Sequence, residues 1–322
     1  MTDRFAAREV SGGEAGGSVL VELREVTVRY GRTLALDSTT MTLRSGDSVA
    51  VLGPDGAGKS TLLRALAGLA RPTSGTVASR LGSSGIGYAR STFDLYGDLT
   101  VLENLSFFGR VRGMEREKLQ ERVEAMLALA NLKGARDKLA GRLSGGMKKG
   151  LALGCALVHE PALLLLDEPT VGVDPVSRQE LWDIIAQATA GGTALVFTST
   201  YLEEAVHASR LVAMERGRAN ETSAERVMAA CEEWSAWVVA VGDDRTAVRA
   251  RLAAVAHEPR VYLRPEGLTA LAIGDTGARD LLTATVGAEF AASALAQSEL
   301  TFEDAFVLTE SGLAAGARPG AA

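Results

Sequence analysis

One glycine-rich stretch limits the possible folds of this chain more than any other feature. Residues 53–60 read GPDGAGKS, and they stand between a short apolar run at 48–52 and a helical pattern that begins near Lys59. Glycines let the backbone turn tightly enough to point several N–H groups at phosphate oxygens. The N-terminus of the following helix adds a dipole that favours an anion. A strand, a glycine loop and a helix in this order predict a phosphate-binding loop in an α/β fold.

The last residues of this loop have distinct expected roles. In the pattern G-x-x-x-x-G-K-[ST], the lysine is Lys59, which would reach the β and γ phosphates. The hydroxyl of Ser60 would contact Mg²⁺. An ordinary glycine-rich turn is the alternative, and the flanking strand and helix argue against it.

Two acidic residues follow a second apolar run. Residues 163–166 are four consecutive leucines, which is typical of a strand covered on both faces, and Asp167 and Glu168 come directly after them. We expect Asp167 to anchor Mg²⁺ through its water shell. We expect Glu168 to be the base that polarises the attacking water. The alternative is that the acids cap the next helix, because Pro169 opens a new turn.

A third motif, LSGGM at 143–147, opens a helical segment that continues to Leu157. Ser144 is a good N-cap residue, so a structural role alone explains it. That role does not explain Gly145 and Gly146, because glycines lower the stability of a helix. Glycines at a helix start make sense where a phosphate approaches the backbone.

Bulk properties exclude several classes of protein. The 322-residue chain has a formal net charge of −6, so it carries no electrostatic signature of nucleic-acid binding. Residues 1–17 lack the apolar core of a signal peptide, and the longest apolar region, 151–166, is too interrupted to span a bilayer. Cys155 and Cys231 lack metal-type spacing and are expected to be thiols in a reducing cytosol. We expect a cytoplasmic protein, and any membrane role would have to come through a partner.

Strands and helical segments alternate along most of the chain, which predicts a parallel sheet with an inserted helical piece. One expected strand, at 193–197, contains the apolar run 194–197 and ends at Phe197, before three hydroxyl residues at 198–200. After about residue 232 alanine dominates, and the pattern becomes βαββαβ, which favours a small ferredoxin-like module. Its expected strands lie near 234–241, 260–263, 268–273 and 289–294, and its expected helices near 246–256 and 277–285.

The glycine loop, LSGGM, LLLLDE and the segment STYLEEA, in this order, resemble the nucleotide-binding subunit of an ABC transporter. The resemblance covers about residues 19–225. It implies a P-loop NTPase of ABC type, with a parallel sheet core, an antiparallel β edge and a helical subdomain at about 95–160. A small α+β C-terminal domain is expected at 226–311, and flexible tails at 1–18 and 312–322.

In that family two subunits form a head-to-tail dimer, and each ATP lies between the P-loop of one subunit and the LSGG residues of the other. The resemblance implies ATP and Mg²⁺ as cofactors, with Mg²⁺ held at Ser60 and Asp167. It implies Tyr30 stacked on adenine, although an aromatic residue that merely finishes a strand is the alternative, and Asp174 at the dimer seam. Phosphate contacts are implied for Gly53, Pro54, Asp55, Gly56, Ala57, Gly58, Lys59, Ser60 and Thr61, and contacts from the opposite subunit for Ser144, Gly145 and Gly146.

Three segments resemble the ABC-2 type exporter branch of the family. They are LYGDLTVLENL at 95–105, LSGGMKK at 143–149, and LTFEDAF at 300–306, which is similar to the SLEDVF element of that branch. The resemblance implies efflux of a drug, lipid or polysaccharide-like cargo. It also implies two partners, a second ABC ATPase subunit and an integral membrane permease that holds the chain at the inner face of the cell membrane.

Two residues depart from the family pattern. Ser91 stands where the family has a glutamine that reaches Mg²⁺ and water, and Thr200 stands where a histidine contacts the γ-phosphate. A threonine hydroxyl has a shorter reach than an imidazole and needs a bridging water. A hydrogen bond to a charged group contributes about 1.5–3 kcal/mol, so losing one is expected to slow hydrolysis roughly 10- to 100-fold. Nucleotide binding should survive, because Lys59 and Glu168 remain.

Three functional hypotheses follow. In the first, the chain pairs with a complete ATPase in an asymmetric exporter, and its intact LSGG residues serve the fast site of the partner. In the second, it forms a homodimer with two slow sites. In the third, it is a non-transport ABC-type module in which ATP binding regulates assembly.

Overall fold

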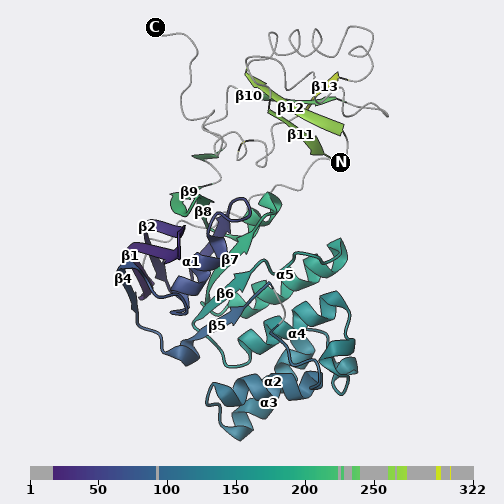
Figure 1. The fold of residues 1–322 in the computed structure, drawn as a ribbon. Coiled ribbons are helices and arrows are strands. Elements are labelled where there is room, and N and C mark those ends of the chain that lie inside the picture. The colour runs from purple at the N-terminus through teal and green to yellow at the C-terminus, as the bar shows by residue number, and fades with distance from the viewer. Residues whose placement is uncertain are drawn as a thin grey trace. The chain divides into compact units, whose positions relative to one another are not determined.

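The computed structural model describes residues 17–91, 94–223, 226–227, 234–239, 260–264, 267–273, 295–298 and 305. The chain divides into two compact units, 1–221 and 222–322. Figure 1 shows the first unit as two sheets and a group of helices.

A six-stranded sheet in the order β5-β6-β7-β3-β8-β9 forms the centre of the first unit. The pairings from β5 through β8 are all parallel. Every residue of β6 and β7 is buried, which is why continuous apolar runs mark these strands in the sequence. The strands are β3 (Ser48–Leu52), β5 (Ile86–Ala89), β6 (Leu163–Asp167), β7 (Ala194–Ser199), β8 (Arg210–Glu215) and β9 (Arg218–Thr222).

A separate antiparallel sheet, in the order β2-β1-β4, confirms the expected antiparallel edge. Its strands are β1 (Val19–Tyr30), β2 (Thr33–Arg44) and β4 (Ser74–Ser79). Helix α1 (Lys59–Leu66) contacts strands of both sheets and buries Leu62 and Leu63 completely. Gly17 and Ser18, which the sequence assigned to a flexible tail, have carbonyls that accept hydrogen bonds from Arg44 and Ser45.

Three helices form the inserted helical piece: α2 (Val101–Val111), α3 (Arg116–Leu129) and α4 (Gly145–Leu157). They pack on one another, and α4 also contacts β5 and α5 (Pro175–Thr189), as Figure 1 shows. Short 3₁₀ helices lie at 83–85, 133–135, 140–142 and 202–207. Among the described residues, no helix is both long and apolar enough to cross a membrane.

The second unit contains an antiparallel sheet in the order β11-β12-β10-β13. Its first strand, β10, lies between the third and the fourth, which suits the expected βαββαβ order. Its strands are β10 (Trp234–Val239), β11 (Arg260–Arg264), β12 (Gly267–Ile273) and β13 (Leu295–Ser298). The expected last strand at 289–294 and both expected helices lie outside the described residues.

Candidate functional site

The carboxyl ends of β3, β6 and β7 meet at one edge of the parallel sheet. Leu52 is paired with Ser199, and Asp167 with Thr198. Because β3 runs directly into the glycine loop, the loop, the two acids and the hydroxyl-rich end of β7 are neighbours. This edge is where ligands bind in open α/β sheets.

The glycine loop lies directly against two other strands. Gly53 and Gly58 have φ angles of +148° and +109°, which favour glycine. A Cβ at Gly53 would lie 2.2 Å from the carbonyl oxygen of Met214, and one at Gly58 would lie 2.3 Å from that of Ala35. At Gly56 a Cβ would meet nothing within 4 Å, so the loop is open on that side. The backbone therefore forms a fixed cradle with one accessible face.

Lys59 lies inside the loop rather than in solvent. Its side chain is 5% exposed, and its Nζ donates hydrogen bonds to the carbonyls of Gly53 at 2.8 Å and Pro54 at 3.1 Å. Carboxylate oxygens of Asp55 and Glu168 lie 3.8 and 4.0 Å from the same nitrogen. The ammonium group thus stands between the loop and the acids at the end of β6.

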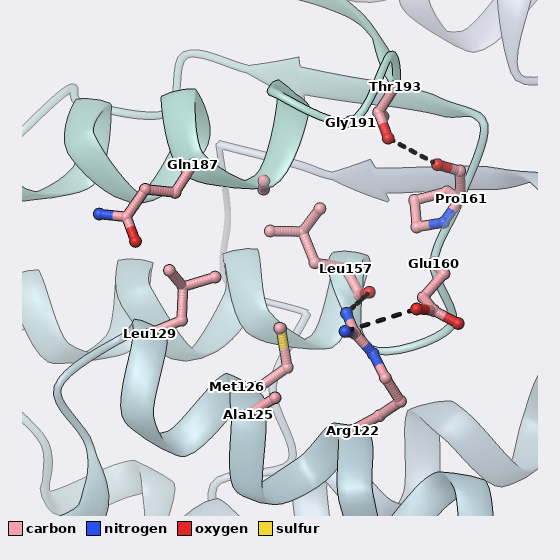
Figure 2. A pocket seen from close by; sticks show the side chains of 11 residues that line it. Arg122, Ala125, Met126, Leu129, Leu157, Glu160, Pro161, Gln187, Gly191 and Thr193 are labelled. Atoms are coloured by element: carbon pink, nitrogen blue, oxygen red, sulfur yellow. Dashed lines mark hydrogen bonds and ion pairs between the residues drawn. The ribbon is translucent and has the colours of Figure 1, made fainter.

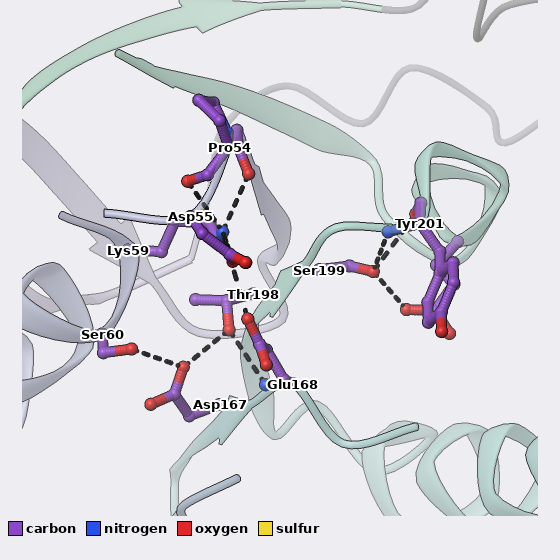
Figure 3. A network of polar contacts seen from close by, with 11 residues as sticks. Pro54, Asp55, Lys59, Ser60, Asp167, Glu168, Thr198, Ser199 and Tyr201 are labelled. Atoms are coloured by element: carbon purple, nitrogen blue, oxygen red, sulfur yellow. Dashed lines mark hydrogen bonds and ion pairs between the residues drawn. The ribbon is translucent and has the colours of Figure 1, made fainter. Parts of the chain in front are cut away.

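Asp167 joins helix α1 to strand β7 (Figure 3). Its Oδ1 accepts hydrogen bonds from the Ser60 hydroxyl at 3.0 Å and from the Thr198 hydroxyl at 2.8 Å. Hydroxyl and carboxylate oxygens are ligands that Mg²⁺ prefers. Because Ser60 is exposed at the helix N-terminus and Asp167 is held beside it, this pair fits a magnesium ion.

Glu168 has its main chain held on both sides. Its φ angle is +50°, an uncommon value for a residue other than glycine. Its N–H donates to the Thr198 hydroxyl at 2.9 Å, and its carbonyl accepts from Lys149 Nζ at 3.0 Å. The side chain is 23% exposed and extends toward Lys59. A partly exposed carboxylate on a fixed backbone is suited to act as a base.

The three hydroxyl residues after Phe197 have three different surroundings. The expected strand end at Phe197 is wrong, because β7 continues through Thr198 and Ser199, both buried. Thr198 bonds the two acids described above, and the Ser199 hydroxyl donates to the buried Glu204 at 2.6 Å. Thr200 is exposed at the edge of the site.

The LSGG residues begin α4 as expected from Ser144. Its hydroxyl accepts a hydrogen bond from the N–H of Met147 at 3.3 Å, so it is the N-cap. Ser144 and Gly145 are exposed, and a Cβ at Gly146 would lie 3.0 Å from the Ser177 hydroxyl. Within the described part of the chain, none of the three hydrogen-bonds to the cluster around Lys59 and Asp167.

Two further predicted residues lie at element ends. Asp174 is the N-cap of α5, where hydrogen bonds from the Ser177 backbone and hydroxyl lower the pKa of its carboxyl group. Tyr30 ends β1 and is 46% exposed, with the Arg64 guanidinium 5.8 Å from its ring centroid. An exposed ring at a strand end is compatible both with stacking on a base and with simple termination of the strand.

Lys149 and Thr198 are site residues that sequence reasoning did not assign. Thr198 was noted only as one of a run of hydroxyls. Lys149, on α4, is 7% exposed, and burial lowers the pKa of its ammonium group while Glu168 and Asp167 oppose that shift. A lysine directly before the apolar part of this helix was the available signal, because a charged residue is rarely buried without partners.

A second cavity, of about 460 Å³, lies between α3, α4 and α5 near the amino ends of β6 and β7 (Figure 2). Arg122 in its wall donates to the carbonyls of Leu157 and Val158 at 3.4 Å and lies 3.5 Å from the carboxylate of Glu160. Lys118 also pairs with Glu160. The charged groups in the cavity wall pair with one another and with main-chain carbonyls. We therefore interpret the cavity as a feature of helix packing and not as a second reacting centre.

Comparisons with known proteins identify the family of this chain. The family model described as ABC transporter matches residues 36–171. A Nod factor export ATP-binding protein I from Burkholderia orbicola is 34% identical over 279 residues, covering 81% of this chain and 92% of the relative. The protein of the same name from Sinorhizobium fredii is 38% identical over 62% of this chain and 61% of its own length.

The match to a probable multidrug ABC transporter ATP-binding protein, YbhF of Escherichia coli, is 41% identical but spans only 32% of that relative and 55% of this chain. Among solved structures, the ATP-binding cassette MJ0796 in a dimeric post-hydrolysis state bound to ADP and Pi is 25% identical with a TM-score of 0.58. That match covers 63% of this chain and 98% of the cassette. Because the Burkholderia relative is matched over almost its whole length and the fold agrees, the chain belongs to the ABC transporter family as an ATP-binding subunit with the P-loop NTPase fold.

Proposed function

We propose that this chain hydrolyses ATP as the motor subunit of an exporter and couples hydrolysis to a separate membrane permease. The observation that supports this most is the cluster at the sheet edge. There Thr198 joins Asp167 to the backbone of Glu168, within reach of Lys59 and Ser60.

Each group in this cluster has a role in phosphoryl transfer. The loop N–H groups and Lys59 bind the phosphates of ATP, and Ser60 and Asp167 hold Mg²⁺, which when bound neutralises charge on the phosphate oxygens. Glu168 polarises the attacking water and accepts its proton. Thr198 fixes the positions of both acids. Most of the catalysis is therefore positioning and charge stabilisation by residues that the fold already holds in place.

A second ABC subunit completes the site in this proposal. Ser144 and Gly145 lie exposed and Gly146 partly exposed at the start of α4, and within the described residues none of the three hydrogen-bonds to the phosphate-loop cluster of its own chain. An ATP held by the cluster would therefore meet these residues from a second subunit, with Asp174 at the seam and Tyr30 against adenine. The dimeric state of the MJ0796 cassette supports this arrangement.

The site is proposed to be slow. Ser91 has its carbonyl bonded to Lys149, and Thr200 is exposed and short, so neither supplies an amide or imidazole to the γ-phosphate. Two arrangements are compatible with a slow site. One is a pair with a complete ATPase whose site uses Ser144 of this chain, and the other is a homodimer.

Relatives named for Nod factor export and multidrug transport support efflux as the process. We propose a drug, lipid or polysaccharide-like cargo. We also propose a position on the cytoplasmic face of the membrane, reached through the permease.

ATP turnover by the purified chain, alone and with a candidate partner ATPase, tests the proposal. In the asymmetric arrangement, Ser144→Ala in this chain should lower the turnover of the pair much more than Glu168→Gln does. In a homodimer, Glu168→Gln should reduce turnover to a small residual rate without any partner. Absence of both ATP binding and turnover, alone and with the partner, would refute the proposed function.

A further inference from the structure

The ammonium group of Lys149 connects three parts of the first unit. Lys149 lies on α4, five residues after Ser144, and its Nζ donates to the carbonyl of Glu168 at 3.0 Å and to the carbonyl of Ser91 at 3.3 Å. Ser91 follows strand β5, and Glu168 follows strand β6. The helix that begins with the LSGG residues is thus bonded directly to the backbone of the proposed base.

A buried charge is retained at a cost unless polar partners surround it. Here the partners are two carbonyls, together with the negative charges of Asp167 and Glu168, which favour the charged form of Lys149. An apolar residue would fill this buried position without that cost. A lysine at this position is therefore best explained by a function that requires a hydrogen-bond donor there.

The conformation of Glu168 indicates what this hydrogen-bond donor does. Its positive φ angle is unfavourable for a side chain with a Cβ and persists only where the surroundings hold it. Thr198 holds the N–H side of the residue and Lys149 holds the carbonyl side. Together these two bonds direct the carboxylate toward the glycine loop.

We propose that Lys149 is a positioning residue for ATP hydrolysis, which orients Glu168 through its carbonyl and ties that orientation to the backbone at Ser91 and to helix α4. The inference rests on the proposed ATP hydrolysis at this site, and it does not depend on the cargo or on the identity of the partner. A displacement of α4 or of the Ser91 backbone would change the Lys149 hydrogen bonds and turn the base.

The first test is Lys149→Met, which keeps the length of the side chain and removes its charge and donors. The same exchange at the exposed Lys133 is the matched control. We expect Lys149→Met to lower kcat roughly 10- to 100-fold while Kd for ATP, measured in the absence of Mg²⁺, stays within about threefold. A variant that merely unfolds would lose binding and turnover together.

The double variant Lys149→Met/Glu168→Gln adds a readout that a purely structural role of Lys149 would not produce. If Lys149 acts through Glu168, Lys149→Met should cause no further loss of turnover in the Glu168→Gln background. Equal and additive losses in both backgrounds would overturn the proposal. So would a kcat within twofold of the Lys133→Met control.

Hydrogen exchange measured by mass spectrometry decides the same question without turnover. Lys149→Met should speed exchange in the peptides that contain Glu168 and Ser91, and Lys133→Met should not. Unchanged exchange at Glu168 would overturn the proposal even if turnover fell. If the wild-type chain hydrolysed no ATP, the proposed function would fail, and the exchange data would still show whether Lys149 holds this backbone.

Discussion

Replacing Thr198 by valine removes one hydroxyl group from the centre of the site and keeps the branched shape of the side chain. The residue has no exposed surface, its hydroxyl donates to Asp167 at 2.8 Å, and it accepts from the N–H of Glu168 at 2.9 Å. A hydrogen bond to a charged group contributes about 1.5–3 kcal/mol, and a buried N–H without a partner costs about 1–3 kcal/mol. Together these predict a loss of about 2.5–6 kcal/mol in the free energy of unfolding. The low end is expected, because Asp167 keeps its bond from Ser60.

Urea-induced unfolding, with Thr198→Ser as the matched control, measures this loss. The serine variant keeps the hydroxyl and removes one methyl group, which should cost about 1 kcal/mol. Thr198→Val should also lower ATP turnover more than Thr198→Ser, because it releases the backbone of Glu168. If the two variants were equally stable, Thr198 would not hold the acids, and the geometric account of the site would be wrong.

Three further substitutions test separate groups of the site. Lys59→Ala should weaken ATP binding at least tenfold, because it removes the charge that the glycine loop encloses; unchanged affinity in a nucleotide-binding titration would contradict this role. Glu168→Gln should lower turnover roughly 100-fold or more, to a small residual rate, and lengthen the lifetime of an ATP-bound dimer, measured by size-exclusion chromatography; if neither changes, this site does not catalyse. Thr200→His should raise turnover of the isolated chain up to roughly 10- to 100-fold, since it restores a contact to the γ-phosphate, and no increase in a correctly folded variant would mean that other missing groups limit the rate.

The parallel core was predictable because its strands are buried on both faces and appear as continuous apolar runs. The leucines of 163–166 and the run at 194–197 became β6 and β7. The antiparallel strands β2 and β4 were not predicted individually. β4 is almost wholly exposed, so no apolar pattern marks it. In β2 the polar run at 37–40 interrupts the alternation of Leu34 and Leu36 with Met41 and Leu43.

The residues proposed to bind the phosphates and Mg²⁺ could be found in the sequence because they follow one another within short motifs. Lys59 and Ser60 are adjacent, and so are Asp167 and Glu168, and each pair takes its position from the strand before it. The extent of β7 was not predictable in this way. A strand that ends in hydroxyl residues looks the same in the sequence whether those hydroxyls face solvent or buried acids.

The amino-acid sequence by itself determined the family, the fold class and the groups that would meet a nucleotide, because these depend on local patterns of glycine, apolar and charged residues. Only the tertiary structure decided what holds the acids in place. Thr198 lies about thirty residues from Glu168 along the chain and Lys149 about twenty, yet they bond the N–H and the carbonyl of that same residue. Contacts of this kind arise from the pairing of β6 with β7 and the packing of α4, and a linear pattern of residues contains no record of them.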